Sequence, residues 1–539
     1  SWETFHANAL IQTGNEPLTR REAKQRDDWD DWYDSEQVEW NRLWADGCFE
    51  WVPADSIGTA RVISTRFVYK KKPHLHKSRL VARGFLQDLS ECGDTWSPVT
   101  RPETVRVLLA WSAAQGRSVL QADVVGAYTK APMDGTPVYA SPPSKEYEKP
   151  GHVLAVRRSL YGLRSSGRNW YLTLCKYLRS QNLTPSTADP CLFMNPDRSI
   201  MVCIYVDDLL ISTSDPAAGL HFIENMNKMK TFGSAWQVKN LGRPKHFLGL
   251  EINWHAFGVK LTQTKMIERL AERFKVSTHP IHSPMVAHNT LEPEDHAESK
   301  PDHSDYRSIC GSINYLASHG CRPDVAFSAK ELSRNLSNPS NAHMRAAKRC
   351  VQYLYTTRHE GLNYDRRKNH SPQGYADADF ANQLSNRRST SGRVIMMYGA
   401  AIMWSSRQQR TVALSTAEAE INSLLELGKD VIWLRRILAE FGTPVSGPTP
   451  LLEDSRSAIK WSSESASWSK TRHLDTAFHK IREWCAAKIM NVEYCHTSAQ
   501  LADVFTKALP TEQHRHMKEY ILNSFPRNDS HRRTAPAAA

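Results

Sequence analysis

The spacing of hydrophobic positions changes several times along the chain and divides it into segments. Residues 1–52 are polar and Trp-rich, and their loose helical spacing predicts a helical lead-in. Residues 53–252 hold β-rich runs interrupted by helical stretches, whereas residues 253–365 are mainly helical and basic. Strand patterns return in residues 366–515 in a βββαβα-like order, which predicts a separate α/β domain. Residues 516–539 form a polar, low-complexity end that we expect to be disordered.

One apolar run contains two adjacent acids. In "IYVDDLLIS", residues 204–212, the pattern predicts strand, turn and strand, with Asp207 and Asp208 at the turn. A further acid, Asp123, lies in the apolar strand "LQADVVGAY". Three carboxylates that meet at one sheet would repel one another unless cations lie among them. Oxygen ligands of this kind suit Mg²⁺, and a pair of such ions catalyses in-line phosphoryl displacement, so the residues predict a two-metal site.

A second set of acids follows the element order of residues 366–515. Strand, helix, strand and final helix each supply one acid, and four such elements bring their acids together only at one end of a mixed sheet. The four acids are Asp377 in "YADADF", Glu420 in "LSTAEAEINSL", Asp454 in "LLEDSRSA" and Asp503 in "QLADVFTKAL". Two of these motifs hold a second acid two residues away, so Asp379 and Glu418 remain alternatives.

Composition narrows the classes of protein. With 539 residues the chain predicts three or four domains, and its net charge of +12 mildly favours a polyanionic partner. Ten scattered cysteines without a C-x-x-C pair argue against a zinc module or a disulfide scaffold. No apolar window approaches the ~18–20 residues of a membrane span, so no membrane partner is expected.

The helical segment before the last domain is basic. We expect its charges to contact the backbone of a nucleic-acid duplex without recognising sequence. They are Arg322, Lys330, Arg334, Arg345, Lys348, Arg349 and Arg358.

Eight blocks, in order over about residues 30–515, resemble the reverse transcriptase–ribonuclease H of copia-type LTR retrotransposons, part of a Pol polyprotein. They are "FVYKKK…KSRLVARGF", "QADVVGAYTKAPM", "SLYGLRSSGRNWY", "ADPCLFM", "IYVDDLLI", "HFLGLEI", "CGSINYLASHGCRPDVAFSAKELS" and "AAKRCVQYL". The resemblance implies an α+β multidomain fold: a right-hand polymerase of fingers, palm and thumb, then a connecting segment and an α/β ribonuclease H-like domain. Fingers and palm would occupy residues 53–252, and thumb and connection residues 253–365.

The resemblance also implies roles for single residues. Asp123, Asp207 and Asp208 would be catalytic metal ligands of the polymerase, and Asp377, Glu420, Asp454 and Asp503 those of the ribonuclease H. Nucleotide-binding residues would be Lys70 and Arg79 on the triphosphate, Tyr128 as the aromatic gate against a 2′-OH, and Tyr161 and Gly162 at the pocket floor. Residues 246–252 resemble the primer grip, and His496 resembles the mobile histidine that helps product leave.

Two motifs depart from the family pattern. In the motif that the family writes "LYGLKQSPRAW", Ser165 replaces the usual Gln and Gly167 the usual Pro. The fingers turn "KKPHLHKS" lacks the usual Asp-Gly tip. These departures concern the nucleotide pocket and the fingers, not the metal ligands.

The implied enzyme is an RNA- and DNA-directed DNA polymerase with ribonuclease H activity, using two Mg²⁺ per site with Mn²⁺ as a substitute. Its partners would be an RNA template, a DNA primer or template, RNA–DNA hybrid and dNTPs. The family also allows a tRNA primer, integrase or capsid proteins and a second copy of the chain. It would work in cytoplasmic virus-like particles, and later in the nucleus with the integration complex.

Two other functions compete with this one. The first is a decayed or host-adopted nucleic-acid-binding protein that keeps the fold, which the presence of all seven acids disfavours. The second is an integrase-type nuclease, which usually carries a zinc-binding His/Cys segment that this sequence lacks.

Overall fold

A computed structural model describes residues 16–72, 75–88, 90, 92–133, 135–231, 234–287, 291, 301–383, 386–463 and 472–525. The chain divides into two compact units, which we describe separately. The first comprises residues 1–101 and 118–243, and the second residues 102–117 and 244–539. In the described parts of both, we find no helix with the length and apolar character that crossing a membrane requires.

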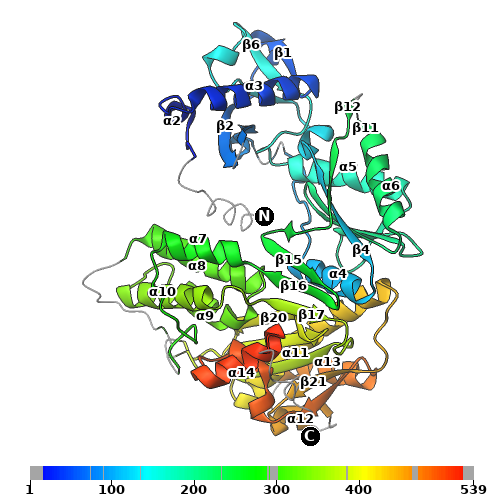
Figure 1. The fold of residues 1–539 in the computed structure, drawn as a ribbon, viewed down its shortest axis with the longest axis vertical. Helices are drawn as coiled ribbons and strands as arrows, with labels where there is room; N and C mark the ends of the chain where they lie inside the picture. Colours follow the sequence, from blue (N-terminus) through cyan, green and yellow to red (C-terminus); the bar gives the residue numbers. More distant parts are fainter. Residues whose placement is uncertain are drawn as a thin grey trace. The chain divides into compact units, whose positions relative to one another are not determined.

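The first unit contains a five-stranded sheet covered by a long helix (Figure 1). Its strand order is β1 (Phe49–Pro53), β6 (His152–Val156), β5 (Val138–Ser141), β2 (Val62–Lys72) and β3 (Leu75–Ala82). Helix α3 (Trp29–Ala45) follows a short helix α2 (Arg20–Ala23), and buries Trp32, Trp40 and Leu43 in one core with Phe67 and Leu80 of the sheet. The described part of the predicted lead-in is therefore largely helical, and α3 shares the core of this sheet.

A second sheet in this unit has six strands and lies in the segment predicted to be fingers and palm. Its order is β13 (Val238–Gly242), β4 (Ser118–Val124), β10 (Asp208–Thr213), β9 (Ile200–Tyr205), β8 (Leu192–Met194) and β7 (Thr184–Pro185). Helices α5 (Ser166–Ser180) and α6 (Pro216–Lys228) share its core through Trp170, Leu178, Phe222 and Ile223. The hairpin β11 (Lys230–Thr231) and β12 (Ser234–Ala235) follows α6, and short 3₁₀ helices η1 (Ala54–Ile57), η2 (Gly84–Leu86), η3 (Ala127–Lys130) and η4 (Lys145–Tyr147) connect the strands.

The second unit begins with a helix that lies within the segment predicted to be fingers and palm. Helix α4 (Pro102–Ala114) packs against β16 (Gly258–Thr262), next to β15 (Leu250–His255), β14 (His246–Phe247) and β17 (Leu362–Asp365). The compact units divide after residue 243, not at the predicted boundary at residue 252, because α4 and residues 244–252 belong to the second unit. The predicted primer grip corresponds to β14 and the start of β15. Helices α7 (Thr264–Arg273), α8 (His303–Ser318), α9 (Ala326–Ser333) and α10 (Asn341–Thr356), with η5 (Pro323–Val325), form the predicted helical segment.

A mixed sheet forms the predicted α/β domain. Its order is β20 (Ala400–Gln408), β19 (Thr390–Met397), β18 (Gln373–Asp379), β21 (Thr449–Glu453) and β22 (Met490–Tyr494), with β21 parallel to both neighbours. Helix α11 (Thr416–Glu440) packs on β18 and β19, because its leucines and valine recur every three or four residues. Helices α12 (Arg456–Ser463) and α13 (Arg472–Ala486) complete the predicted order of elements. The predicted α+β architecture is confirmed.

The C-terminal boundary is wrong. Helix α14 (Thr511–Leu522) buries Met517, Ile521 and Leu522, so the part of the predicted disordered tail up to Leu522 is a packed helix. Residues 526–539 of that prediction lie outside the described residues.

Candidate active sites

The two adjacent aspartates lie at a strained hairpin turn, as the sequence predicts. Tyr205 of β9 pairs with Asp208 of β10, which leaves Val206 and Asp207 as a two-residue loop. Val206 has φ 56°, a left-handed conformation that costs a β-branched residue about 1–3 kcal/mol. The indole Nε1–H of Trp170 donates to the Val206 carbonyl at 2.6 Å and helps to hold this turn.

Strand pairing brings the third polymerase acid to the same place. Asp208 lies directly opposite Asp123 in the antiparallel β10–β4 pair, and the Val124 amide donates to the Asp207 carbonyl at 2.9 Å. Burial and the nearby charges of Asp207 and Asp123 raise the pKa of Asp208 to about 6. Burial also raises the pKa of Asp207. Crowded, half-buried carboxylates of this kind fit divalent cations, because a bound cation removes the repulsion between them.

A cavity of about 520 Å³ lies beside these acids in the first unit. Asp123 and Asp207 line it with Tyr161 and Arg79, whose guanidinium lies over the Tyr161 ring at 4.9 Å. Tyr128 packs edge-on against Tyr161, with ring centroids 4.8 Å apart. Four of the predicted nucleotide-pocket and metal residues therefore surround one cavity, with Tyr128 against its wall.

Two residues predicted to bind the nucleotide are not among those that line the described part of the cavity. Lys70 is exposed, and it pairs with Lys77 in the β2–β3 hairpin without lining the described part of the cavity. Gly162 has φ 92°, and a Cβ there would lie 2.0 Å from the Ala82 carbonyl oxygen. Gly162 is thus explained by the close approach of two backbone segments.

Sequence reasoning missed other residues that line the cavity. Lys77 and Lys239 add positive charge, and Lys239 lies opposite Asp123 in the β13–β4 pairing. Arg42 and Glu39 reach the cavity from α3. The alternation of β3 pointed to Lys77, whereas the contributions of α3 and β13 depend on tertiary packing.

The structure brings together three of the four predicted ribonuclease H acids. Carboxylate oxygens of Asp377 on β18, Glu420 on α11 and Asp454 after β21 all lie within 4.8 Å of one another. Burial and the neighbouring Glu453 carboxylate raise the pKa of Glu420. Its buried Oε2 has no hydrogen-bond partner among the described residues, as expected for an atom that binds a cation.

The fourth acid lies beside a lysine. Asp503 belongs to the short 3₁₀ helix η7 (Leu501–Phe505), not to the final helix as predicted. Lys507 Nζ lies 2.8 Å from Asp503 Oδ1 and 3.8 Å from Asp377 Oδ2. Burial alone would lower the pKa of Lys507, but the two carboxylates outweigh burial and raise it.

The alternative acids have other partners. Glu418 accepts from the Leu414 amide at 2.7 Å, as a residue at the start of a helix does. Asp379, at the end of β18, lies outside the carboxylate group that the described residues form. His496 is exposed and caps η6 (Thr497–Ala499). The geometry therefore favours Asp377 and Glu420.

One acid of this site was missed. Glu453 is fully buried next to Asp454, and burial raises its pKa well above the ordinary value. The adjacent Glu-Asp pair was visible in the sequence, but its burial depends on β22 and α11.

The basic segment is largely engaged within the protein. Arg322 is fully buried and forms a double ion pair with Asp324, at 2.9 and 2.7 Å, so its predicted contact with a duplex is wrong. Lys330 and Arg334 both pair with Glu331, and Arg358 pairs with Glu268. Arg345 and Lys348 of α10 are exposed.

Comparisons with known proteins show what this chain is similar to. Residues 51–287 match the family model described as reverse transcriptase (RNA-dependent DNA polymerase). The chain is 30% identical to the retrovirus-related Pol polyprotein from transposon TNT 1-94 of Nicotiana tabacum, over 95% of this chain and 39% of that protein. It is 29% identical to the retrovirus-related Pol polyprotein from transposon RE1 of Arabidopsis thaliana, over 83% of this chain and 31% of that protein. It is 26% identical to the transposon Ty1-H Gag-Pol polyprotein of Saccharomyces cerevisiae, over 84% of this chain and 26% of that protein. The chain thus spans less than two fifths of these relatives.

Among solved structures, the foamy viral protease-reverse transcriptase in complex with RNA/DNA hybrid is 14% identical, with a TM-score of 0.46, covering 89% of this chain and 55% of that one.

Residues 51–287, which contain the paired carboxylates, are therefore similar to reverse transcriptases. More particularly, the chain is related along nearly its whole length to the Pol polyproteins of copia-type retrotransposons, which confirms the predicted resemblance. Reverse transcriptases generally use divalent metal ions.

Proposed function

We propose that this chain is a retrotransposon reverse transcriptase: an RNA- and DNA-directed DNA polymerase that also cleaves the RNA of an RNA–DNA hybrid. The observation that carries the proposal is the pairing of Asp123 with Asp208, beside Asp207, at the edge of a cavity that also holds Arg79 and Tyr161. Acids, a guanidinium and an aromatic ring are what a metal–nucleotide complex needs around it.

In the polymerase site, Asp123, Asp207 and Asp208 would hold two Mg²⁺, with Mn²⁺ as a substitute. Bound cations of this kind stabilise the attacking and leaving oxygens of an in-line displacement, in which a primer 3′-OH attacks a dNTP and pyrophosphate leaves. Arg79 and Lys77 would bind triphosphate oxygens, and Arg79 is suited to a bidentate contact. Tyr161 and Tyr128 would form the wall against the sugar.

In the second site, Asp377, Glu420 and Asp454 would hold the cations for cleavage of the RNA strand, with Asp503 as the fourth acid. Asp377, Glu420 and Asp503 are buried, and a less polar surrounding strengthens the attraction between a carboxylate and a cation. Lys507 would hold Asp503 and Asp377 in place when no cation is bound.

The relatives are Pol polyproteins of transposons, and the partners and location proposed here are those expected of such an element. We propose an RNA template, a DNA primer or template, hybrid and dNTPs as ligands, and a tRNA primer, integrase, capsid proteins or a second copy as further partners. Cytoplasmic virus-like particles would be the place of synthesis, followed by the nucleus.

The test uses a labelled DNA primer on an RNA template with dNTPs and Mg²⁺ or Mn²⁺. Primer extension, RNA shortening and binding of the hybrid are measured on the same preparation. Extension with RNA shortening supports the proposal. A protein that binds the hybrid with either ion but neither extends nor cleaves it would instead be the decayed nucleic-acid-binding protein.

A further inference from the structure

The short helix that carries Tyr128 is held from its far side by a buried polar network. Helix η3 spans Ala127–Lys130 and begins after Gly126, which has φ 63°. Tyr128 contacts Tyr161 at the cavity wall, whereas the next two residues, Thr129 and Lys130, are buried. The position of the Tyr128 ring therefore depends on what Thr129 and Lys130 contact.

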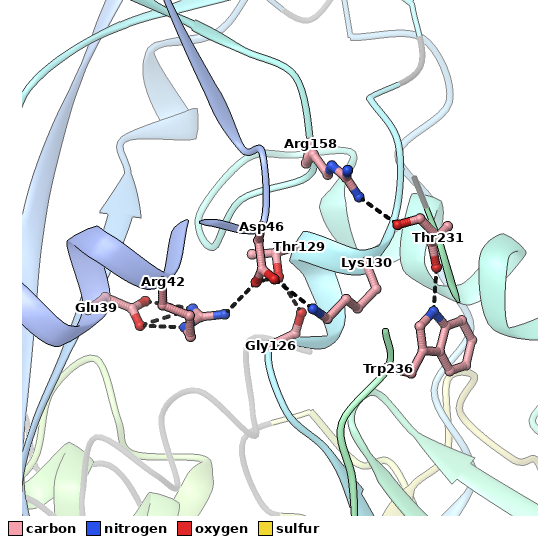
Figure 2. Close-up of polar contacts among 9 residues, drawn as sticks. All are labelled: Glu39, Arg42, Asp46, Gly126, Thr129, Lys130, Arg158, Thr231 and Trp236. Carbon is pink, nitrogen blue, oxygen red and sulfur yellow. Dashed lines mark hydrogen bonds and ion pairs between the residues drawn. The ribbon is translucent and has the colours of Figure 1, made fainter. Parts of the chain in front are cut away.

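Both residues contact one carboxylate (Figure 2). Lys130 Nζ donates to Asp46 Oδ1 at 2.8 Å. Thr129 Oγ1 lies 3.0 Å from Asp46 Oδ2 and 2.7 Å from the Gly126 carbonyl oxygen. Asp46 is the residue that ends helix α3, 82 positions earlier in the chain than Tyr128. One side chain thus connects α3 to the turn that carries the tyrosine.

The same carboxylate also holds an arginine that lines the cavity. Arg42 Nη1 donates to Asp46 Oδ2 at 3.1 Å, and its other nitrogens donate to Glu39 (Figure 2). Arg42 lies against Gly126, where a Cβ would come within 2.4 Å of Nη1. Arg42 and η3 therefore cannot move independently of each other.

Asp46 is charged in this network. Burial alone would raise the pKa of its carboxyl, but the Lys130 ammonium, the Thr129 hydroxyl and Arg42 lower the pKa below the ordinary value. Replacing the carboxylate by an amide leaves the Lys130 ammonium, which is 3% exposed, beside a neutral group. A buried cation in that position is unfavourable, so η3 should shift or loosen.

We propose that Asp46 is a positioning residue for sugar discrimination: by fixing Thr129, Lys130 and Arg42, it sets the place of Tyr128 and thereby the exclusion of ribonucleotides. This rests on the proposed function, in which Tyr128 contacts the sugar of the incoming nucleotide. Asp46 itself does not line the described cavity, so it acts through its neighbours.

The test measures kcat/KM for single-nucleotide incorporation of a dNTP and the matching rNTP by wild type, Asp46→Asn, Tyr128→Ala and the double variant. Asp46→Asn should lower the dNTP-over-rNTP preference by about tenfold. In the Tyr128→Ala background, Asp46→Asn should change the preference no further. Glu50→Gln is the control, because Glu50 forms an exposed ion pair with Arg157 at 2.6 Å and should leave the preference unchanged.

Several outcomes separate the possible failures. If Asp46→Asn lowers both kcat/KM values equally, or shifts the preference equally with and without Tyr128, the positioning role is wrong. If Tyr128→Ala leaves the preference unchanged while incorporation continues, Tyr128 does not discriminate the sugar and the positioning role falls with it. If wild type incorporates nothing, the proposed function fails instead. Should Asp46→Asn unfold, Thr129→Val removes one contact and should shift the preference in the same direction by a smaller factor; no shift would overturn the proposal.

Discussion

Both carboxylate clusters bring negatively charged groups close together, but they differ in sequence spacing, burial and neighbouring charges. The proposed polymerase acids Asp207 and Asp208 are adjacent in sequence at a strained turn, and Asp207 lines a cavity with lysines and arginines around it. The proposed ribonuclease H acids come from separate elements and are mostly buried. Lys507 lies within ion-pair distance of one of them, Asp503.

The difference shows how each cluster is stabilised before a cation arrives. In both sites, burial and neighbouring carboxylates raise carboxyl pKa values: that of Asp208 to about 6 in the first site, and that of Asp503 to about 7 in the second. The second site also contains Lys507, whose charge compensates Asp503 and Asp377. Both sites should therefore respond to pH, and the second also to loss of its lysine.

The largest effect should come from the acids that meet in the second cluster. Glu420→Gln should lower RNA cleavage by about 10²-fold or more, because a cation ligand is lost, while primer extension stays unchanged. Glu418→Gln is the matched control two residues away, and should weaken a helix-start hydrogen bond without removing a cation ligand. Equal losses of cleavage in both variants would show that the choice of Glu420 is wrong.

A smaller effect should follow from Lys507→Met. In EDTA the free energy of unfolding of the variant should be about 1 kcal/mol lower than that of wild type, with a lower melting temperature. The reason is that Asp503 and Asp377 lose their compensating charge. Added Mg²⁺ should stabilise the variant more than wild type. Lys480→Met, which removes an exposed pair with Glu483, is the control. An unchanged melting temperature in EDTA would contradict this role of Lys507.

In the polymerase cluster, Asp208 should make stability depend on pH. Because the folded-state pKa of Asp208, about 6, lies above its ordinary value of 3.8, the folded protein binds this proton more tightly than the unfolded chain. The contribution of Asp208 to stability is therefore lost as pH rises from about 4 to about 6. In EDTA at pH 7, Asp208→Asn should be more stable than wild type by about 1 kcal/mol, with no difference at pH 4. Thermal unfolding across this range tests the sign, and a stability gap that does not vary with pH would contradict it.

The smallest effect should come from the support of the turn. Trp170→Phe removes the 2.6 Å hydrogen bond to the Val206 carbonyl, which is worth about 1 kcal/mol, and should slow extension several-fold without affecting RNA cleavage. Trp236→Phe is a matched control, since Trp236 packs in the same core and donates to Thr231 instead. Equal slowing in both variants would indicate a loss of packing only.

Local patterns predicted the first site well and the second only in part. The Asp207–Asp208 hairpin and the strand of Asp123 follow from alternation over a few residues, so their elements agree with the structure. The second cluster needs long-range contacts: Asp503 was placed in the wrong helix, and Glu453 was missed because its burial depends on β22 and α11.

The charge pattern of the basic segment did not predict which of its residues are buried. Arg322 was predicted to be on a basic surface, but Asp324, two residues later, pairs with it in the interior. The link from Asp46 to Lys130 spans 84 positions and leaves no local signal at either end. Such contacts become visible only when the elements are packed.

The most direct test of two separate sites follows extension and RNA cleavage in one tube for wild type, Asp207→Asn and Asp377→Asn. The account predicts that Asp207→Asn abolishes extension alone and Asp377→Asn abolishes cleavage alone. If either substitution removes both activities while hybrid binding and melting temperature are retained, the two clusters do not act as independent sites and the account is wrong.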